Sequence, residues 1–146
     1  MFEVYELLPG RLYQSGLPAA ESIEAHLQNA PAMDVVIDLT GVLDPFSCAN
    51  PIYIAVPLED APQLPSDMPG LWTLAAAAAD WIAEGRRVLV HCVAGINRSS
   101  LVNGMILFRA GFGDGPAIVS HIRQCRPGAL MNATFAAFLE TLRPAP

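Results

Sequence analysis

The stretch VLVHCVAGINRSS, from Val88 to Ser100, decides the fold that the rest of the chain completes. It starts as an apolar strand and runs into a segment, SSLVNGMILFRAG, that is apolar nearly all round and so predicts a buried helix. Between strand and helix stand a histidine, a cysteine, a glycine and an arginine. A strand, a polar loop and a buried helix in succession are typical of an α/β domain, where ligands bind beyond the carboxyl ends of the strands.

Further strands and helices are predicted on both sides of this stretch. Strands are expected over 11–16, 34–39 and 52–58, and the last two are apolar enough for burial on both faces. Helices are expected over 20–30, from about 71 to the stop at Gly85, after an Asp114 cap and after an Asn132 cap. The pattern predicts one α/β domain over residues 1–146, with a central, mostly parallel sheet flanked by helices on both faces.

Composition excludes several classes of function. The formal charge is −6 and all eight basic residues are arginines, so no basic surface for nucleic acid or membranes is expected. No apolar run approaches the roughly 20 residues of a membrane-spanning helix. The start, MFEVYELLPG, lacks the basic flank and apolar core of a secretory signal, which favours a cytoplasmic location. The three cysteines include no CxxC pair, so no zinc site is expected and a reducing compartment suits them.

The polar residues after the strand predict an anion site. Residues 93–97, which are Val93, Ala94, Gly95, Ile96 and Asn97, must curl so that their backbone N–H groups face inward at a helix N-terminus. Gly95 permits the backbone conformation that such a curl needs. Arg98 adds a planar, permanently charged fork suited to two phosphate oxygens. The expected ligand is therefore a tetrahedral oxyanion.

A thiol stands at the floor of this cradle. The partial positive charge that binds phosphate also favours a thiolate, which makes Cys92 a candidate nucleophile toward phosphorus. The hydroxyl of Ser99 is positioned to hydrogen-bond the sulfur and to help it leave in a second step. His91 is expected to hold the loop in shape by hydrogen bonds rather than to transfer protons.

A cysteine cannot protonate the group that it expels from a phosphate ester. A carboxylic acid on a separate loop can, and the segment EDAPQLPSDM offers Glu59, Asp60 and Asp67. Asp60 follows a predicted strand whose end opens on the same side as Cys92. We expect Asp60 to be the acid, with Asp67 as the alternative.

These residues resemble a known family. HCVAGINRS matches the HCxxGxxR(S/T) signature of the cysteine-dependent protein tyrosine phosphatases, and its AGxxRS form is similar to the small dual-specificity branch. PGRLYQSG, DVVIDLT, VPLEDAP and CRPGALMNATFAAFL resemble other segments of that branch, so the likeness covers nearly the whole chain. The resemblance implies that Cys92 is the nucleophile, Arg98 the phosphate clamp, Ser99 the leaving-group partner and Asp60 the acid, about thirty residues before the cysteine.

The resemblance implies a phosphatase that needs neither metal nor cofactor and acts on phosphorylated proteins or small phosphate esters. The aromatic loop of the tyrosine-specific enzymes has no counterpart that we can place, and the cradle has no lysine, unlike relatives that act on inositol lipids. Either phosphotyrosine or phosphoserine and phosphothreonine would fit. The sequence does not set an oligomeric state, and a monomer is compatible with it.

Two other functions remain open at this stage. A rhodanese-like sulfurtransferase also carries a cysteine at the head of an anion-binding loop, but needs no acid on a neighbouring loop. A binding module that recognises phosphate without turnover is the third class. Cys48 and Cys125 are interpreted as small apolar residues, and whether either one protects Cys92 through a disulfide stays open.

Overall fold

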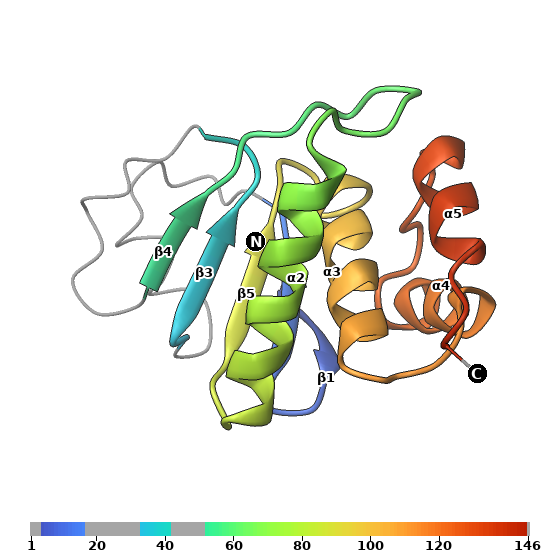
Figure 1. Ribbon diagram of the computed structural model, residues 1–146. Helices are drawn as coiled ribbons and strands as arrows, with labels where there is room; N and C mark the ends of the chain where they lie inside the picture. The colour runs from blue at the N-terminus through green and yellow to red at the C-terminus, as the bar shows by residue number, and fades with distance from the viewer. Residues whose placement is uncertain (1–3, 17–32, 42–51, 146) are drawn as a thin grey trace.

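A computed structural model describes residues 4–16, 33–41 and 52–145 of the chain, and its centre is a sheet of five strands in the order β1-β2-β5-β3-β4. The hairpin of β1 (Val4–Leu8) and β2 (Leu12–Ser15) is antiparallel. The other neighbours, β2 with β5 (Val88–His91), β5 with β3 (Val35–Asp38) and β3 with β4 (Ile52–Ala55), are parallel. Figure 1 shows the sheet with helices packed against it.

The predicted strands are present, with two differences from expectation. β3 and β5 are buried on both faces, as their apolar sequences predict. β4 is not, because it forms the edge of the sheet beside β3 and two of its four residues are exposed. β1 was not predicted, although the Pro9-Gly10 turn and the residues before it fit a hairpin, with Gly10 at φ 69°.

Four helices follow the pattern expected from the sequence. They are α2 (Met68–Ala83), α3 (Arg98–Arg109), α4 (Gly115–Cys125) and α5 (Ala133–Glu140). The Asp114 and Asn132 side chains cap α4 and α5 by accepting from the amides of Ala117 and Phe135. The helix expected over 20–30 lies outside the described residues, as does Cys48.

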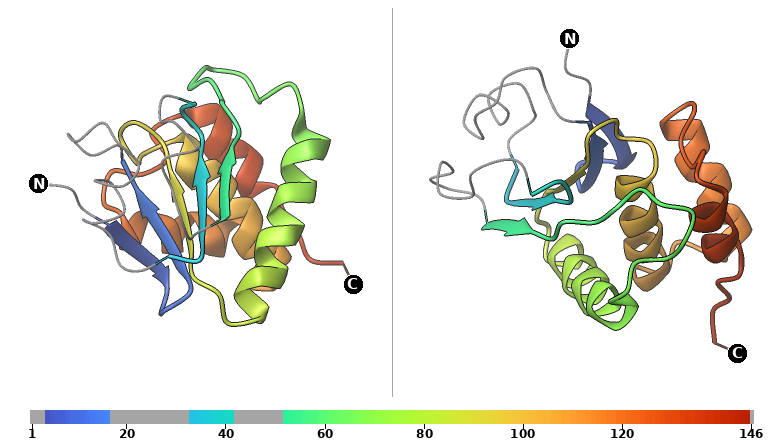
Figure 2. Two further views of the ribbon diagram at one scale, coloured as in Figure 1. Left: turned by 90° about the vertical axis from the view of Figure 1, so that its left-hand side faces the viewer. Right: turned by 90° about the horizontal axis from the view of Figure 1, so that it is seen from above.

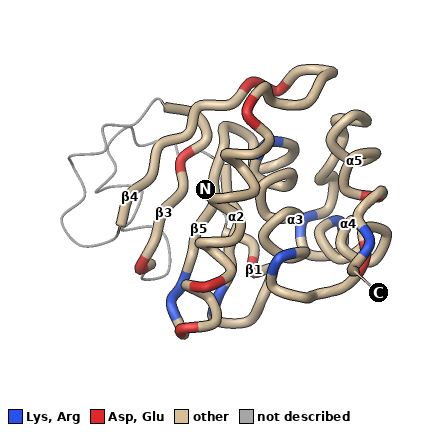
Figure 3. Tube along the Cα trace, in the orientation of Figure 1, with Lys and Arg blue, Asp and Glu red and all other residues tan. Residues whose placement is uncertain are grey.

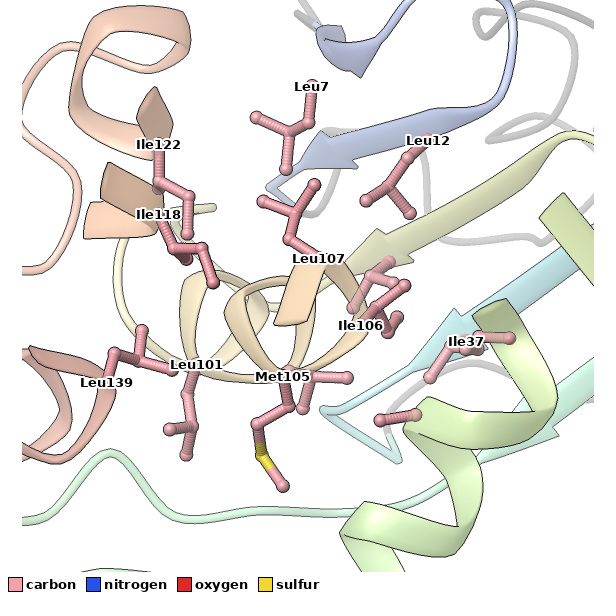
Figure 4. Close-up of a cluster of buried hydrophobic side chains, with 14 of the residues drawn as sticks. Leu7, Leu12, Ile37, Leu101, Met105, Ile106, Leu107, Ile118, Ile122 and Leu139 are labelled. Atoms are coloured by element: carbon pink, nitrogen blue, oxygen red, sulfur yellow. The ribbon is translucent and has the colours of Figure 1, made fainter. Parts of the chain in front are cut away.

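The main core lies between one face of the sheet and all four of these helices. Alternate strand residues, including Leu12, Val35 and Ile37, pack there against fully buried side chains of α3. Leu101, Met105 and Ile106 of α3 lie at the centre of this cluster, and Ile118 and Leu139 close it from α4 and α5 (Figure 4). The opposite face has a smaller cluster around Val36 and Leu89. Because α3 is buried in this core over most of its length, its first residue, Arg98, is held in place relative to the sheet.

The parallel strands end at one edge of the sheet, and the loops that follow β4 and β5 meet there. Figure 2 shows the loop after β5 and the loop between β4 and α2 at this edge, with α3 running back from it. We call residues 92–97 the cysteine loop and residues 56–67 the acidic loop. None of the helices in the described ranges is long and apolar enough to cross a membrane.

Candidate active site

The thiol of Cys92 lies in a closed setting directly after β5. The residue is 2% exposed, and its backbone amide donates to the carbonyl of Ser15 at 3.3 Å. Its sulfur is hydrogen-bonded to the hydroxyl of Ser99 at 3.3 Å. Because Ser99 is in the first turn of α3, the sulfur faces the start of that helix, where a partial positive charge favours an anion.

Carbonyl groups of the cysteine loop accept hydrogen bonds from β2, from α3 and from the segment after α4. The carbonyl of Gly95 accepts from the amide of Gln14 at 3.0 Å and from Arg126 Nε at 3.3 Å. The carbonyl of Ile96 accepts from the Ser100 hydroxyl at 2.7 Å and from the Leu130 amide at 2.9 Å. In a planar trans peptide the next N–H points the opposite way from the carbonyl. The amides that follow these carbonyls therefore face inward, as a cradle for an oxyanion requires.

Two glycines let the cysteine loop lie against the end of β2. Gly95 has φ +68°, and a Cβ there would come within 2.7 Å of the Gly16 nitrogen and 2.8 Å of the Ser15 carbonyl carbon. A Cβ on Gly16 would come within 2.7 Å of the Val93 carbonyl oxygen. Backbone therefore contacts backbone on this side, and any side chain would push the loop out of position.

The buried side chain of Gln14 links the cysteine loop and β2 to α3. Gln14 donates to the hydroxyl of Ser100 at 2.7 Å as well as to the loop, and its side-chain oxygen accepts from Asn103 at 3.0 Å. All three side chains are fully buried. The hydrogen bonds of Gln14 link β2 to the cysteine loop and to α3 and so restrict the distances between them. Among the described residues, the side-chain oxygen of Asn103 is buried without a hydrogen-bond partner.

Arg98 is the first residue of α3, as the sequence predicts for the helix start. Its guanidinium is part-buried and donates to the carbonyl of Leu58 at 3.0 Å. Leu58 belongs to the acidic loop, so the arginine reaches from the start of α3 to the segment that carries the carboxylates. Figure 3 shows acidic residues in this segment, close to the start of α3.

The carboxylate of Asp60 is held against the cysteine loop. It accepts from the side-chain amide of Asn97 at 2.8 Å and from that of Asn132 at 2.9 Å. Asp67 is placed differently, because its carboxylate caps α2 by accepting from the Gly70 amide at 3.0 Å. Of the two predicted aspartates, Asp60 is thus the one that contacts the cysteine loop.

His91 is fully buried at the end of β5, with Nε2 3.6 Å from a carboxylate oxygen of Asp38 on β3. Burial lowers the pKa of His91, although the charge of Asp38 acts in the other direction. Burial alone would raise the pKa of Asp38, but hydrogen bonds from Thr40 and Tyr53 hold it below its ordinary value. A buried imidazole with a lowered pKa therefore stands directly before Cys92, and its part in shaping the cysteine loop stays a prediction.

Several residues around the site were not predicted from the sequence. Gln14 and Arg126 lie 81 and 31 positions from Gly95, the residue that they contact. Asn103 is on α3, close to the cysteine loop along the chain, but its partner Gln14 is 89 positions away. Asn132 was interpreted as a helix cap, with the family resemblance as a secondary clue, and its contact with Asp60 depends on where α5 packs. Cys125, whose pKa burial raises, lies on α4 with its sulfur 3.6 Å from Nε2 of His121.

Neither the protein-family models nor the curated proteins include a match to this sequence. Solved structures do match. DUSP15 superposes with a TM-score of 0.77 at 22% identity, over 94% of this chain and 85% of that chain. Human DUSP28 gives 0.74 at 22% identity, over 94% and 90%. A human tyrosine phosphatase-like serine/threonine/tyrosine-interacting protein gives 0.73 at 19% identity, over 94% and 93%.

These similarities extend over nearly the whole chain and confirm the α/β architecture with its mostly parallel sheet. They agree with the resemblance that the segment HCVAGINRS carries in the sequence. The chain therefore has the fold of the cysteine-dependent protein tyrosine phosphatases, at the size of their small dual-specificity branch.

Proposed function

We propose that this protein is a phosphatase that hydrolyses phosphate monoesters through a phospho-cysteine on Cys92, with Asp60 as general acid and base. The observation that carries the proposal is the 2.8 Å hydrogen bond from Asn97 to Asp60. It attaches a carboxyl group from a separate loop to the loop that begins with the thiol. The fold shared with dual-specificity phosphatases supports the same reaction class.

In the first step the thiolate of Cys92 attacks phosphorus and forms an S–P bond. The P–O ester bond breaks, and its electron pair goes to the leaving oxygen, which takes a proton from Asp60. Inward N–H groups of the cysteine loop and the Arg98 guanidinium bind the phosphoryl oxygens while charge builds on them. The alcohol or phenol then departs.

In the second step water attacks the phosphorus of the phospho-cysteine. Asp60, now a carboxylate, takes the proton of the water, and the S–P bond breaks with its electron pair on sulfur. Ser99 is hydrogen-bonded to that sulfur in the structure, so its hydroxyl is in place to stabilise the leaving thiolate. Inorganic phosphate and the free enzyme result, and no metal or cofactor takes part in either step.

The residues around the cradle point to substrates with a single phosphate. Within the part of the chain that the structure describes, Arg98 and Arg126 are the basic residues whose guanidinium groups hydrogen-bond to the acidic loop or the cysteine loop, and Arg126 is occupied by backbone carbonyls. The carboxylate of Asp60 adds negative charge at the same edge. A phosphorylated tyrosine, serine or threonine side chain, or a small phosphate ester, suits this balance better than a polyphosphorylated ligand.

Hydrolysis of p-nitrophenyl phosphate with a chelator present tests the proposal. We expect turnover that is inhibited by vanadate and abolished by Cys92→Ser. For substrates with poor leaving groups, Asp60→Asn should lower the turnover rate by about 10²- to 10⁴-fold. A bell-shaped pH profile should lose its alkaline limb in Asp60→Asn. Full activity of Cys92→Ser would contradict the mechanism.

The same measurements separate the other two functions. A sulfurtransferase would transfer sulfane sulfur to cyanide and would not need Asp60. A binding module would retain phosphopeptides without releasing phosphate, and Cys92→Ser would leave its retention and its lack of turnover unchanged. Trapping of phosphopeptides on Cys92→Ser, followed by identification of the phosphorylated residue, would define the substrate class.

A further inference from the structure

We propose that Val93 and Met131 form an apolar contact surface beside the phosphate cradle, and that this surface binds an apolar side chain next to the phosphorylated residue of a protein substrate. We call these two residues the apolar rim. The inference rests on the proposed function and deepens it, because it names a feature of the substrate beyond the phosphate group.

The most exposed large apolar side chains of the described ranges lie on segments that adjoin this site. Met131 is 74% exposed and Val93 is 51% exposed. The other two large apolar residues that are exposed there, Ile52 and Phe112, lie at the start of β4 and after the end of α3, away from the cysteine loop. Single exposed apolar residues are common on protein surfaces, but two of them beside one site indicate a binding surface.

Val93 places the first part of the rim next to the nucleophile. It directly follows Cys92, which is 2% exposed, so the chain passes from a buried thiol to an exposed isopropyl group in one step. The carbonyl of Val93 lies against the end of β2, where a Cβ on Gly16 would come within 2.7 Å of its oxygen. The backbone of Val93 is therefore confined, and its side chain is left at the surface at the start of the cysteine loop.

Met131 is held at the other end of the same loop by its two neighbours. The backbone amide of Leu130 donates to the carbonyl of Ile96 at 2.9 Å, and the backbone amide of Asn132 donates to Oδ1 of Asn97 at 2.8 Å. Both acceptors belong to the last two residues of the cysteine loop. Met131 therefore adjoins the cradle, although it is distant from the loop along the chain.

The backbone before Met131 is strained. Leu130 has φ +60°, and it is the one residue other than glycine with positive φ in the part of the chain that the structure describes. A bulky residue keeps this conformation only where its surroundings hold it. The side chain of Leu130 is 2% exposed, and its carbonyl accepts from Arg123 at 3.0 Å. Strain that is maintained beside an active site is typical of segments with a part in binding.

Charge and area favour a protein substrate over other occupants of the rim. Anionic membranes bind basic surfaces, whereas Glu59 and Asp60 are exposed on the neighbouring acidic loop and the formal charge of the chain is −6. A stable dimer buries about 800 Å² on each partner, far more than two side chains supply. One apolar side chain of a substrate needs only a contact of this size.

Such a side chain is within reach of the rim when the phosphate occupies the cradle. Consecutive Cα atoms are about 3.8 Å apart, so residues within two positions of the phosphorylated residue lie within about 8 Å of it. A methionine is flexible and adapts to side chains of different shape. We therefore expect a preference for apolar residues as a class rather than for one residue type.

The experiment compares short phosphopeptides that differ at one position. The parent peptide has serine at the two positions on each side of the phosphorylated residue, and leucine replaces one serine at a time. One set carries phosphotyrosine and another carries phosphothreonine, and the set with the higher kcat/KM is analysed. We expect leucine to raise kcat/KM about tenfold at one or more of the four positions, mainly through a lower KM.

Substitutions in the rim should remove this preference. In Met131→Ala the ratio of kcat/KM for the leucine and serine peptides should fall to about two, whereas Met131→Leu keeps the apolar area and should retain the ratio. Val93→Thr keeps the branched shape but adds a hydroxyl, and should lower the ratio about threefold. Ile52→Ala is the matched control, because it removes an exposed apolar side chain at the other end of the sheet. Thermal unfolding of each variant shows whether it is folded.

A ratio close to one at all four positions in wild type, or an unchanged ratio in both Met131→Ala and Val93→Thr, would overturn the inference. Binding to phosphatidylserine vesicles, or self-association in sedimentation, that is lost in Met131→Ala would also overturn it, because the rim would then belong to a membrane or dimer contact. In each of these cases Cys92-dependent turnover of p-nitrophenyl phosphate would leave the proposed function intact. Absence of that turnover in wild type would instead overturn the proposed function, and the inference with it.

Discussion

The side-chain amide of Gln14 lies 2.7 Å from the hydroxyl of Ser100, which joins β2 to the first turn of α3. The same amide donates to the carbonyl of Gly95, and Ser100 donates to the carbonyl of Ile96. Two neighbouring carbonyls of the cysteine loop are thus fixed, one directly by Gln14 and one through Ser100. The inward direction of the following N–H groups depends on both bonds.

Ser100→Ala removes the hydroxyl that connects these groups. We expect a loss of about 1–3 kcal/mol in the free energy of unfolding, because the buried Gln14 amide and Ile96 carbonyl each lose a partner. The dissociation constant for vanadate should rise, since the inward amides lose their support. Denaturant unfolding and vanadate titration measure the two effects, and Ser120→Ala, on the exposed side of α4, serves as the control. Unchanged vanadate binding would contradict the assigned support.

Gly95→Ala tests the contact between the cysteine loop and β2. Gly95 and Gly111 both have positive φ, +68° and +81°, but only Gly95 has backbone atoms within 3 Å of the added Cβ. Gly111→Ala, with nothing within 4 Å, should cost only the conformational penalty of about 1 kcal/mol. Gly95→Ala should cost more and should remove most of the phosphatase activity. If both variants kept full activity and showed similar decreases in melting temperature, the close contacts of a Cβ at position 95 would have no effect on the site, which would contradict this prediction.

The buried pair of His91 and Asp38 predicts how stability depends on pH. Because the pKa of His91 is lowered in the folded state, the unfolded chain binds more protons below the ordinary value of 6.5. Stability attributable to neutral His91 is therefore complete above 6.5 and decreases as the pH falls below it. The lowered pKa of Asp38 adds stability that is present above 3.8 and lost as the pH falls through the folded value.

Melting temperatures measured from pH 8 to pH 3 should therefore fall in two stages. His91→Gln should flatten the first stage, below pH 6.5, because glutamine takes up no proton. The two proteins differ at position 91 alone, so the difference between the two curves isolates His91. Parallel curves for wild type and His91→Gln would show that this histidine does not carry the expected dependence.

Gly104→Ala probes the packing of α5 on α3. A Cβ on Gly104 would lie 2.6 and 2.7 Å from the two δ-carbons of Leu139, which is fully buried. We expect destabilisation of about 1–3 kcal/mol from overpacking, measured by denaturant unfolding. Since α5 begins beside Asn132, the same change should reduce turnover of phenyl phosphate more than of p-nitrophenyl phosphate. Combining Gly104→Ala with Leu139→Ala should cost less than the sum of the two single changes.

The sequence predicts the parts of this structure that depend on neighbours along the chain. The strand Val88–His91, the helix start at Arg98 and the Asp114 and Asn132 caps all follow from local pattern and capping chemistry. Cys92 and Ser99 were also expected to meet, because a helix start folds back toward the strand that precedes it. Local patterns cannot distinguish an edge strand from a central one, which is why β4 was wrongly expected to be buried.

The parts that were missed depend on contacts between distant segments. Gln14 looks like an ordinary polar residue in a strand, and only the pairing of β2 with β5 brings it under the cysteine loop. The choice of Asp60 over Asp67 was made on its position after a predicted strand and on the spacing in the family that the sequence resembles. The structure adds a physical reason, since one carboxylate caps α2 and the other contacts Asn97. The contact of Asn132 with Asp60 spans 72 positions, beyond any periodicity.

The 72-position contact between Asp60 and Asn132 has a consequence for the order in which this protein is made. A ribosome that has released Cys92 and Asp60 from its exit tunnel has not yet released Asn132 or α5. A nascent chain at that stage contains Cys92 and Asp60 but lacks one of the two side-chain amides that donate to Asp60. It also lacks Phe135 and Leu139, which are fully buried in the core with α3, so the core and the hydrogen bonds to Asp60 are completed together when α5 packs.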